Sequence, residues 1–415
     1  MELQSYLKEN WIKQQNTDLN EQEINDPLYQ AEEELAESPA FFFDQDKFAA
    51  RVKKVKEYLG ENIPLTFSIK ANPFLLNCLP ETISHVEVCS PGELTICQKM
   101  AIAPEKIIYS GVMKERTDIR RAILYGVGIL TAESLLHVKM ENDIAEGMGR
   151  QKVILRLTSG NQFGMSEEDI EYIISHQDRF PNLEFYGIHY YSGTQKSLRK
   201  IKKDLDKIES AISTLDEKYG FKPELIEYGP GLCVYYFEPD WEEKEKAALD
   251  EAATVLKEFA KKYPLGIEMG RFLAASCGKY FTTVKDIKTQ GDANYVILDG
   301  GIHHLNYFGQ RMAMEVPPIR YATEGKKAPD EEVDYTLFGS LCTVADVLVR
   351  EVRLPHLDID DVLEFGHCGA YSMTEAPALF LSRFLPAIYA YSSDKGYELL
   401  RDHIPASDIN KPVTE

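Results

Sequence analysis

One lysine closes an apolar segment, at a place where an amine could take part in chemistry. Lys70 follows the run Leu65–Ile69 and precedes Ala71-Asn72-Pro73. Burying an ammonium is costly, so such a lysine either keeps its charged end in water or uses its amine in a reaction. A desolvated amine can attack a carbonyl carbon and form a Schiff base. Taken alone, Lys70 fits both interpretations.

Other short apolar segments also end in residues that could bind or react. A glycine turn, Gly229-Pro230-Gly231, follows one segment, and backbone amides in such a turn can approach a phosphate closely. Another segment ends in an acid, a small residue and a fixed cation, Glu268-Met269-Gly270-Arg271. The remaining candidates at such ends are Glu87, Ser90, Arg156, His189, Tyr191 and Thr194. Each also has a structural interpretation, as a core histidine, a turn former or half of an ion pair.

The segments that hold these residues alternate with longer amphipathic stretches. The clearest stretch lies between Ser197 and Gly220, and its apolar residues recur at every third or fourth position: Leu198, Ile201, Leu205, Ile208, Ile212 and Leu215. Strands that alternate with helices in this way are typical of a (β/α)8, TIM-type barrel. The predicted strands are Leu65–Ile69, Val86–Cys89, Ile107–Ser110, Gly128–Thr131, Val153–Thr158, Leu183–Tyr191, Leu225–Tyr228 and Leu265–Glu268.

A smaller, mainly β domain is predicted after Arg271. Tyr280–Lys288 and Tyr295–Leu298 resemble strands with no helical stretch between them, and a Gln-Gly-Asp turn separates the two. Further strand candidates are Val347–Leu354, Asp361–Phe365 and Phe41–Phe43, the last of which precedes the barrel and could join the β domain. We therefore predict an acidic arm over residues 1–39, a barrel over 40–271 and a β domain over 272–415.

The candidates should meet at one face of the barrel, because active sites of such barrels lie at the C-terminal ends of the strands. Together they suit one ligand, pyridoxal 5'-phosphate (PLP). Its aldehyde would react with Lys70, its phosphate would meet the amides of Gly229 and Gly231, and its pyridine nitrogen would face Glu268.

The order of these motifs resembles the group III PLP-dependent decarboxylases, which include diaminopimelate, ornithine and arginine decarboxylases and share an alanine-racemase-like barrel. Ser68-Ile69-Lys70-Ala71-Asn72 is similar to the family's Schiff-base lysine segment. Glu268-Met269-Gly270-Arg271 is similar to its Glu-Pro-Gly-Arg, where the glutamate meets the pyridine nitrogen. The other matching segments are Glu87–Glu93, Phe163-Gly164, Gly229-Pro230-Gly231 in place of three glycines, Gly339–Cys342 and Gly369-Ala370-Tyr371.

The resemblance implies roles for single residues. Lys70 would be the catalytic lysine, and Cys342 of a partner subunit would protonate the carbanion left by decarboxylation, so a homodimer with shared sites is implied. Thr343, Asp346 and His303 would face the amino-acid substrate. The residues expected to bind PLP are Lys70, Glu87, Arg156, His189, Tyr191, Thr194, Gly229, Gly231, Glu268, Gly270, Arg271 and Tyr371.

The chain departs from the family pattern where the substrate should bind. Tyr191 stands in place of a histidine that stacks on the cofactor, and a tyrosine can stack on a pyridine ring as well. Thr343 replaces the glutamate that recognises the distal amine in diaminopimelate decarboxylases. At these positions the chain is more similar to decarboxylases of secondary-metabolite or siderophore pathways. One of these enzymes acts on glutamate attached to an acyl carrier protein. A racemase on the same barrel and an inactive regulatory homologue are the alternatives.

The amino-acid composition limits the classes of partner and the cellular compartment that we expect for this chain. The 46 Lys and Arg residues against 67 Asp and Glu residues give a net charge of −21, which argues against nucleic acid and anionic membranes as partners. The sequence offers neither a bilayer-spanning apolar run nor a signal peptide. Seven scattered cysteines without CxxC pairs favour reduced thiols in the cytoplasm and argue against a metal site. A local basic cluster that could attract an acidic carrier, or simply form a solvated helix face, comprises Lys196, Arg199, Lys200, Lys202 and Lys203.

Overall fold

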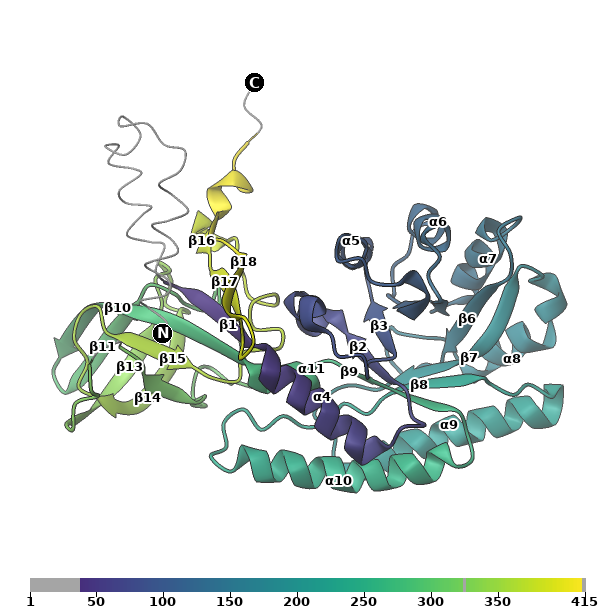
Figure 1. Ribbon diagram of the computed structural model, residues 1–415, viewed down its shortest axis with the longest axis horizontal. Helices are drawn as coiled ribbons and strands as arrows, with labels where there is room; N and C mark the ends of the chain where they lie inside the picture. Colours follow the sequence, from purple (N-terminus) through teal and green to yellow (C-terminus); the bar gives the residue numbers. More distant parts are fainter. Residues whose placement is uncertain (1–37, 324–325, 413–415) are drawn as a thin grey trace. The chain divides into compact units, whose positions relative to one another are not determined.

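The computed structural model describes residues 38–323 and 326–412, so all but the last two residues of the predicted acidic arm lie outside the described residues. The described chain forms two compact units, which are drawn in Figure 1. The barrel unit contains residues 49–235 and 240–273. The sheet unit contains residues 38–48, 236–239 and 274–412.

The barrel unit is a closed barrel of eight parallel strands, which confirms the predicted fold class. Each strand pairs with the next along the chain, and the last closes on the first with Thr66 opposite Glu268. The predicted strands are all present, with ends that differ by at most two residues. They are β2 (Leu65–Ser68), β3 (His85–Val88), β4 (Ile107–Tyr109), β5 (Ile129–Ala132), β6 (Gln151–Arg156), β7 (Leu183–Tyr191), β8 (Leu225–Gly229) and β9 (Leu265–Met269).

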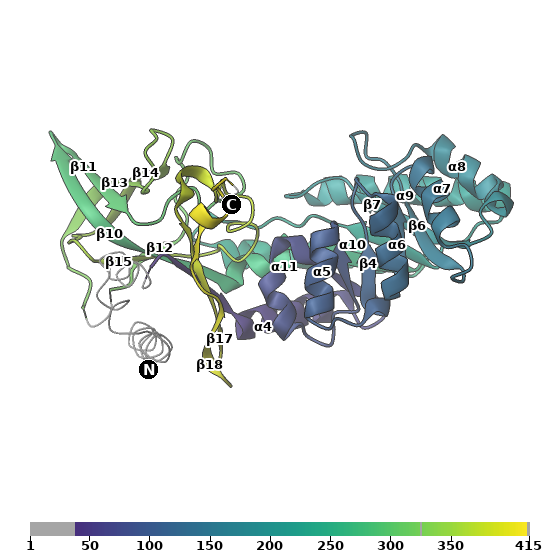
Figure 2. The same cartoon turned by 90° about the horizontal axis from the view of Figure 1, so that it is seen from above.

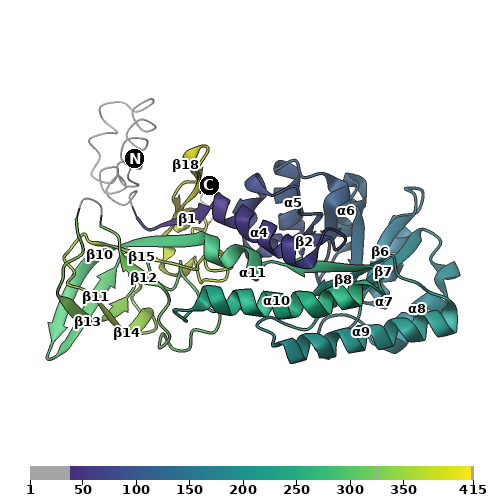
Figure 3. The same ribbon diagram turned by 60° about the horizontal axis from the view of Figure 1, so that its bottom comes forward.

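Helices connect the barrel strands, and the longest of them follows its sequence pattern. α9 (Leu198–Tyr219) begins after Ser197 and ends at Gly220, whose left-handed backbone stops the helix. α9 buries its apolar stripe and lies beside α10 (Trp241–Ala260), as Figure 3 shows. The other helices are α4 (Gln45–Leu59), α5 (Pro91–Lys99), α6 (Arg116–Tyr125), α7 (Leu135–Ile144), α8 (Glu167–Ser175) and α11 (Arg271–Ala274).

The interior of the barrel changes from apolar to polar along the strands. Ile108, Ile129, Ile154 and Leu225 pack together in one layer. Two residues further along each strand, on the same face, come buried polar residues, among them Arg156 after Ile154. The other buried polar residues of this kind are Ser110, Thr131 and Glu227. Polar side chains therefore gather toward the C-terminal ends of the strands, where the site was predicted.

The sheet unit is built on a nine-stranded sheet, and Figure 2 shows several of its strands side by side. β1 (Ala40–Asp44) pairs antiparallel with β10 (Gly278–Gln290) and parallel with β17 (Ala387–Ser392), so the Phe41–Phe43 segment belongs to this sheet. The remaining strands of this sheet are β11 (Ala293–Leu298), β12 (Ile319–Tyr321), β13 (Glu332–Phe338), β14 (Val347–Pro355), β15 (Val362–Phe365) and β18 (Gly396–Arg401); β16 (Phe384–Leu385) and β19 (Ile404–Pro405) form a separate pair.

Three features bear on the classes of partner considered above. The helices of the described residues are too short or too polar to cross a bilayer. Within the same residues, no group of three His, Cys, Asp or Glu side chains could hold a metal ion. All seven cysteines are free thiols.

Candidate active site

Lys70 lies at the mouth of the barrel between two buried acids. It belongs to a single 3-10 turn, η1 (Ile69–Ala71), directly after β2, so its side chain starts at the C-terminal end of that strand. Its Nζ donates to Oε2 of Glu87 at 2.6 Å and lies 3.8 Å from Oε1 of Glu268. Both carboxylates are almost fully buried, whereas 37% of the Lys70 side chain is exposed. The protein therefore orients the amine, while more than a third of the side chain that carries it is exposed.

Glu268 stays ionised although it is buried. Its Oε1 accepts a hydrogen bond from Ser68 Oγ at 2.9 Å, and its Oε2 is 3.1 Å from Nε2 of His189. Burial alone would raise the pKa of Glu268, but the charge of Lys70 and the contacts with His189 and Ser68 hold it well below its ordinary range. A carboxylate that keeps its charge in this way is suited to face a protonated ring nitrogen.

Cys89 also contacts Lys70, although the sequence analysis did not select it. Its Sγ lies 3.5 Å from Lys70 Nζ and donates to Oε1 of Glu87 at 3.3 Å. Burial and then the negative charge of Glu87 raise the pKa of the Cys89 thiol well above its ordinary value, so Cys89 is a neutral donor. The sequence did contain a signal for Cys89, because Glu87 and Cys89 are alternate residues of one extended segment and so share a face.

Two glycines allow backbones to approach each other around this group. A Cβ at Gly270 would lie 2.9 Å from the Cβ of Ala71, so a side chain there would push against the turn that holds Lys70. A Cβ at Gly231 would collide with the carbonyl oxygen of Gly193, and the backbone of Gly231 is left-handed at φ +57°. The loops after β7 and β8 therefore pack backbone against backbone.

The end of β7 places Tyr191 against the glycine turn after β8. A Cβ at Gly229 would lie 2.5 Å from Cδ2 of Tyr191, so the tyrosine ring lies against the Gly229 backbone. Burial raises the pKa of Tyr191, and its phenol is neutral. Tyr191 and Thr194 are half-buried. Stacking of Tyr191 on a cofactor ring stays a prediction.

Arg156 is held by an acid that the sequence analysis missed. Its Nη1 donates to Oε1 of Glu133 at 2.7 Å, and the other oxygen of Glu133 accepts the Gly164 N–H at 2.9 Å. The guanidinium also lies over the Phe163 ring, 4.7 Å from its centroid. Phe163 and Gly164 thus anchor the loop after β6 to Arg156, and contact of Arg156 with a cofactor stays a prediction.

The other predicted residues belong to the sheet unit, where Asp346 organises a loop. Its carboxylate accepts the backbone N–H groups of Ile302 at 2.8 Å and Leu341 at 2.7 Å. Cys342, which follows Leu341, is exposed, and Thr343 is half-buried. Asp346 is itself 1% exposed, so its visible role is to hold the loop that presents the thiol of Cys342.

His303 and Tyr371 have unusual environments in the same unit. His303 is 1% exposed, and burial followed by the charge of Arg383 lowers its pKa to about 4, so the imidazole is neutral. Tyr371 is half-buried and has a left-handed backbone at φ +66°, which is uncommon for a residue with a side chain. Contact of either residue with a ligand stays a prediction.

Comparison with known proteins identifies the family. Residues 45–275 match the family described as pyridoxal-dependent decarboxylase, pyridoxal binding domain. The chain belongs to the pyridoxal-dependent decarboxylases. The resemblance inferred from the motifs is thereby confirmed.

The relatives of this decarboxylase cover most of its length. It is 28% identical over 410 residues to the L-glutamyl-[BtrI acyl-carrier protein] decarboxylase of Niallia circulans, with 90% of this chain and 93% of the relative covered. It is 26% identical over 371 residues to the 2-[(L-alanin-3-ylcarbamoyl)methyl]-2-hydroxybutanedioate decarboxylase of Staphylococcus aureus, with 82% and 91% covered. The crystal structure of diaminopimelate decarboxylase from Helicobacter pylori complexed with L-lysine has the same fold, with a TM-score of 0.79, 22% identity, and 92% and 98% of the two chains covered.

The barrel site of this decarboxylase fits its family's cofactor, pyridoxal phosphate. Lys70 supplies an amine on a partly exposed side chain, and Glu268 supplies a negative charge within 4 Å of that amine. The turn at 229–231 has glycines at both ends, and a Cβ there would collide with Tyr191 or with Gly193 and Lys196, so the backbone of the turn is held close to its neighbours. The chemistry of these groups matches an aldehyde, a ring nitrogen and a phosphate, respectively.

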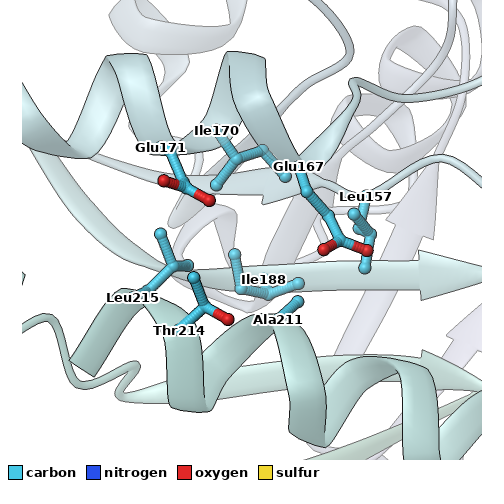
Figure 4. Close-up of a pocket in the computed structure, with 8 residues that line it drawn as sticks. All are labelled: Leu157, Glu167, Ile170, Glu171, Ile188, Ala211, Thr214 and Leu215. Carbon is cyan, nitrogen blue, oxygen red and sulfur yellow. The ribbon is translucent and has the colours of Figure 1, made fainter. Parts of the chain in front are cut away.

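A small pocket elsewhere in the barrel is separate from this site. A small pocket between α8, α9 and β7 is lined by Leu157, Glu167, Ile170, Glu171, Ile188, Ala211, Thr214 and Leu215, and Figure 4 shows that its lining is mostly aliphatic. None of the predicted site residues lines it.

The predicted basic surface cluster needs a correction. Lys196 is buried, because its ammonium turns inward to Asp204, while Arg199, Lys200, Lys202 and Lys203 are exposed.

Proposed function

We propose that this decarboxylase removes the α-carboxylate of an amino-acid derivative whose distal end carries no free amine. The observation that supports the reaction is the Lys70 amine, which is held between buried Glu87 and Glu268 at the end of a partly exposed side chain. The observation that supports the substrate class is Thr343, a neutral hydroxyl in the position where the resemblance places an amine-binding glutamate. A neutral hydroxyl cannot neutralise a buried ammonium.

The residues of the chain divide the work of the reaction. When bound, pyridoxal phosphate supplies the electron sink for the bond to the departing carboxylate. Lys70 would hold the cofactor through its amine, which Glu87 orients. Glu268, which stays ionised, would hold a proton on the ring nitrogen and so maintain the capacity of the ring to accept electrons.

Cys342 is proposed to donate the proton that replaces carbon dioxide, acting from a second copy of the chain. Its exposure supports this proposal, as does Val344, which is 95% exposed only two residues later. Large apolar side chains exposed in this way are suited to an interface. The anchored carboxylate of Asp346 would keep the loop in one conformation while its tip meets the partner.

The names of two relatives support a substrate without a free distal amine. One acts on a glutamyl group attached to an acyl carrier protein, and the other acts on a carbamoyl derivative. In both, the distal end is joined to a larger group. The exposed Arg199, Lys200, Lys202 and Lys203 at the start of α9 would favour an acidic carrier over a basic one.

A substrate panel tests the proposal directly. The purified holoenzyme is incubated with diaminopimelate, lysine, ornithine, glutamate, a glutamate γ-amide and a glutamate γ-thioester of pantetheine, and released carbon dioxide is measured. We expect kcat/KM to be highest for an amide or thioester. Diaminopimelate or lysine as the best substrate would contradict the substrate class. Loss of optical rotation without carbon dioxide would instead identify a racemase.

A further inference from the structure

The ammonium of Lys196 lies beneath the loops at the ends of β7 and β8. Its Nζ donates to Ser192 Oγ at 3.2 Å, to Asp204 Oδ2 at 2.8 Å and to the Gly229 carbonyl oxygen at 2.8 Å. An ammonium has three N–H donors, so these acceptors use all of them. The side chain has no exposed surface. Lys196 therefore has no donor left for a ligand and acts through the groups that it holds.

The charge of Lys196 is balanced by Asp204, which projects from α9. Oδ2 of Asp204 also accepts hydrogen bonds from Ser192 Oγ at 2.7 Å and from the Tyr228 hydroxyl at 3.0 Å. Burial lowers the pKa of Lys196, and its hydrogen bond and charge interaction with Asp204 oppose that shift. A buried ion pair of this kind stabilises a fold little better than apolar side chains of the same volume. We therefore expect this ion pair to affect the positions of the groups that it binds more than the stability of the fold.

The backbone of Lys196 binds the same turn as its side chain. The Lys196 N–H donates to the Gly231 carbonyl oxygen at 2.8 Å, while the ammonium holds the Gly229 carbonyl two residues earlier. A Cβ at Gly231 would lie 2.8 Å from Cε of Lys196. Lys196 thus fixes both ends of the 229–231 turn and ties it to Ser192, at the end of β7.

We propose that Lys196 is a positioning residue for the phosphate of the cofactor. By pulling the carbonyl groups of Gly229 and Gly231 toward itself, it sets the orientation of the turn whose amides would meet the phosphate. The proposal rests on the proposed function, because the phosphate is that of its cofactor. It assigns Lys196 a phosphate-specific effect without direct contact, in place of a role in a basic surface.

The test compares two aldehydes that differ in the phosphate. Apoenzyme of the wild type and of Lys196→Met is titrated with pyridoxal phosphate and with pyridoxal, and binding is followed by the absorbance of the lysine-bound cofactor. We expect Lys196→Met to raise the Kd for pyridoxal phosphate about tenfold or more and to leave the Kd for pyridoxal within about twofold. If Lys196 had only a structural role, the variant would bind both aldehydes more weakly and to the same extent.

Matched variants make the test decisive. Asp204→Asn should act in the same direction as Lys196→Met, and Lys218→Met, at an exposed lysine in the last turn of the same helix, should leave both Kd values unchanged. If Lys196→Met does not fold, Ser192→Ala removes one acceptor and should raise the Kd for pyridoxal phosphate about threefold. The proposal is overturned if the folded variant binds pyridoxal phosphate like the wild type, or loses both aldehydes equally. A wild type without the lysine-bound absorbance would instead contradict the proposed function.

Discussion

The buried carboxylates around Lys70 in the barrel unit and that of Asp346 in the sheet unit serve different purposes. In the barrel unit, Glu87 and Glu268 converge on Lys70, whose side chain remains partly open. In the sheet unit, the buried carboxylate of Asp346 instead accepts the main-chain N–H groups of Ile302 and Leu341. Burial of a charge therefore does not by itself identify an active site. What distinguishes the barrel site is an amine that two buried carboxylates orient at the end of a partly exposed side chain.

Replacement of Lys70 should produce the largest effect. Lys70→Ala removes the amine that holds the cofactor, so we expect kcat to fall by about 10⁴-fold and the absorbance of the lysine-bound cofactor to vanish. Lys70→Arg is the matched control, because it keeps the charge near Glu87 and Glu268 but cannot form the Schiff base. Activity in either variant, measured as carbon dioxide release, would show that the barrel site is not where the reaction occurs.

The two buried acids on neighbouring strands β8 and β9 should respond differently. Glu268→Gln removes a permanent charge and should lower kcat by about 10²- to 10³-fold. Burial raises the pKa of Glu227 to about 8, so this residue is largely uncharged at neutral pH, and Glu227→Gln should change kcat by less than about threefold. Steady-state kinetics at pH 7 separate the two. Equal losses would mean that position, not charge, matters at Glu268.

The depressed pKa of Glu268 also predicts how stability depends on pH. A carboxyl whose pKa is lower in the folded than in the unfolded state stabilises the fold above its unfolded pKa of 4.5, and this contribution is lost as the pH falls through the folded pKa. The difference in free energy of unfolding between wild type and Glu268→Gln should be constant above about pH 5.5 and shrink as the pH falls below 4.5. Urea titrations across this range measure it. A difference that grows on acidification would contradict the assignment.

Cys342→Ala should affect chemistry with little effect on folding. Loss of the proposed proton donor should lower turnover by about 10- to 100-fold, while cofactor binding persists. Because the thiol is exposed, the free energy of unfolding should change by less than about 0.5 kcal/mol. Product analysis by mass spectrometry would detect carbanion side products. Unchanged kinetics and products would remove Cys342 from the mechanism.

Asp346→Asn should show the opposite pattern and the smallest effect on catalysis. The neutral amide leaves one of two buried N–H groups poorly paired, so we expect a loss of about 1–3 kcal/mol of unfolding free energy. In the folded protein, the Kd for pyridoxal phosphate should stay unchanged. Thermal and urea unfolding measure the first effect and absorbance titration the second. A higher substrate KM with unchanged stability would place Asp346 in contact with the substrate instead.

The units also differ in how much of them could be predicted from sequence. The barrel strands follow one another along the chain and pair with their sequence neighbours, so local hydrophobic patterns were sufficient. In the sheet unit, β12, β13, β17 and β18 were not predicted, and β17 is completed by β1 from near the start of the described chain. Local patterns carry no information about such distant pairing.

The sequence alone determined the barrel, the cofactor and the positions of Lys70 and Glu268, because strand ends and their motifs are local features. Only the tertiary structure decided the environments of individual side chains. It placed Cys89 beside Lys70, Glu133 against Arg156 and Lys196 inside the protein. The physical reason is that each of these partners comes from a different strand or loop. Whether a lysine faces water or a carbonyl oxygen depends on the neighbour that folding brings to it.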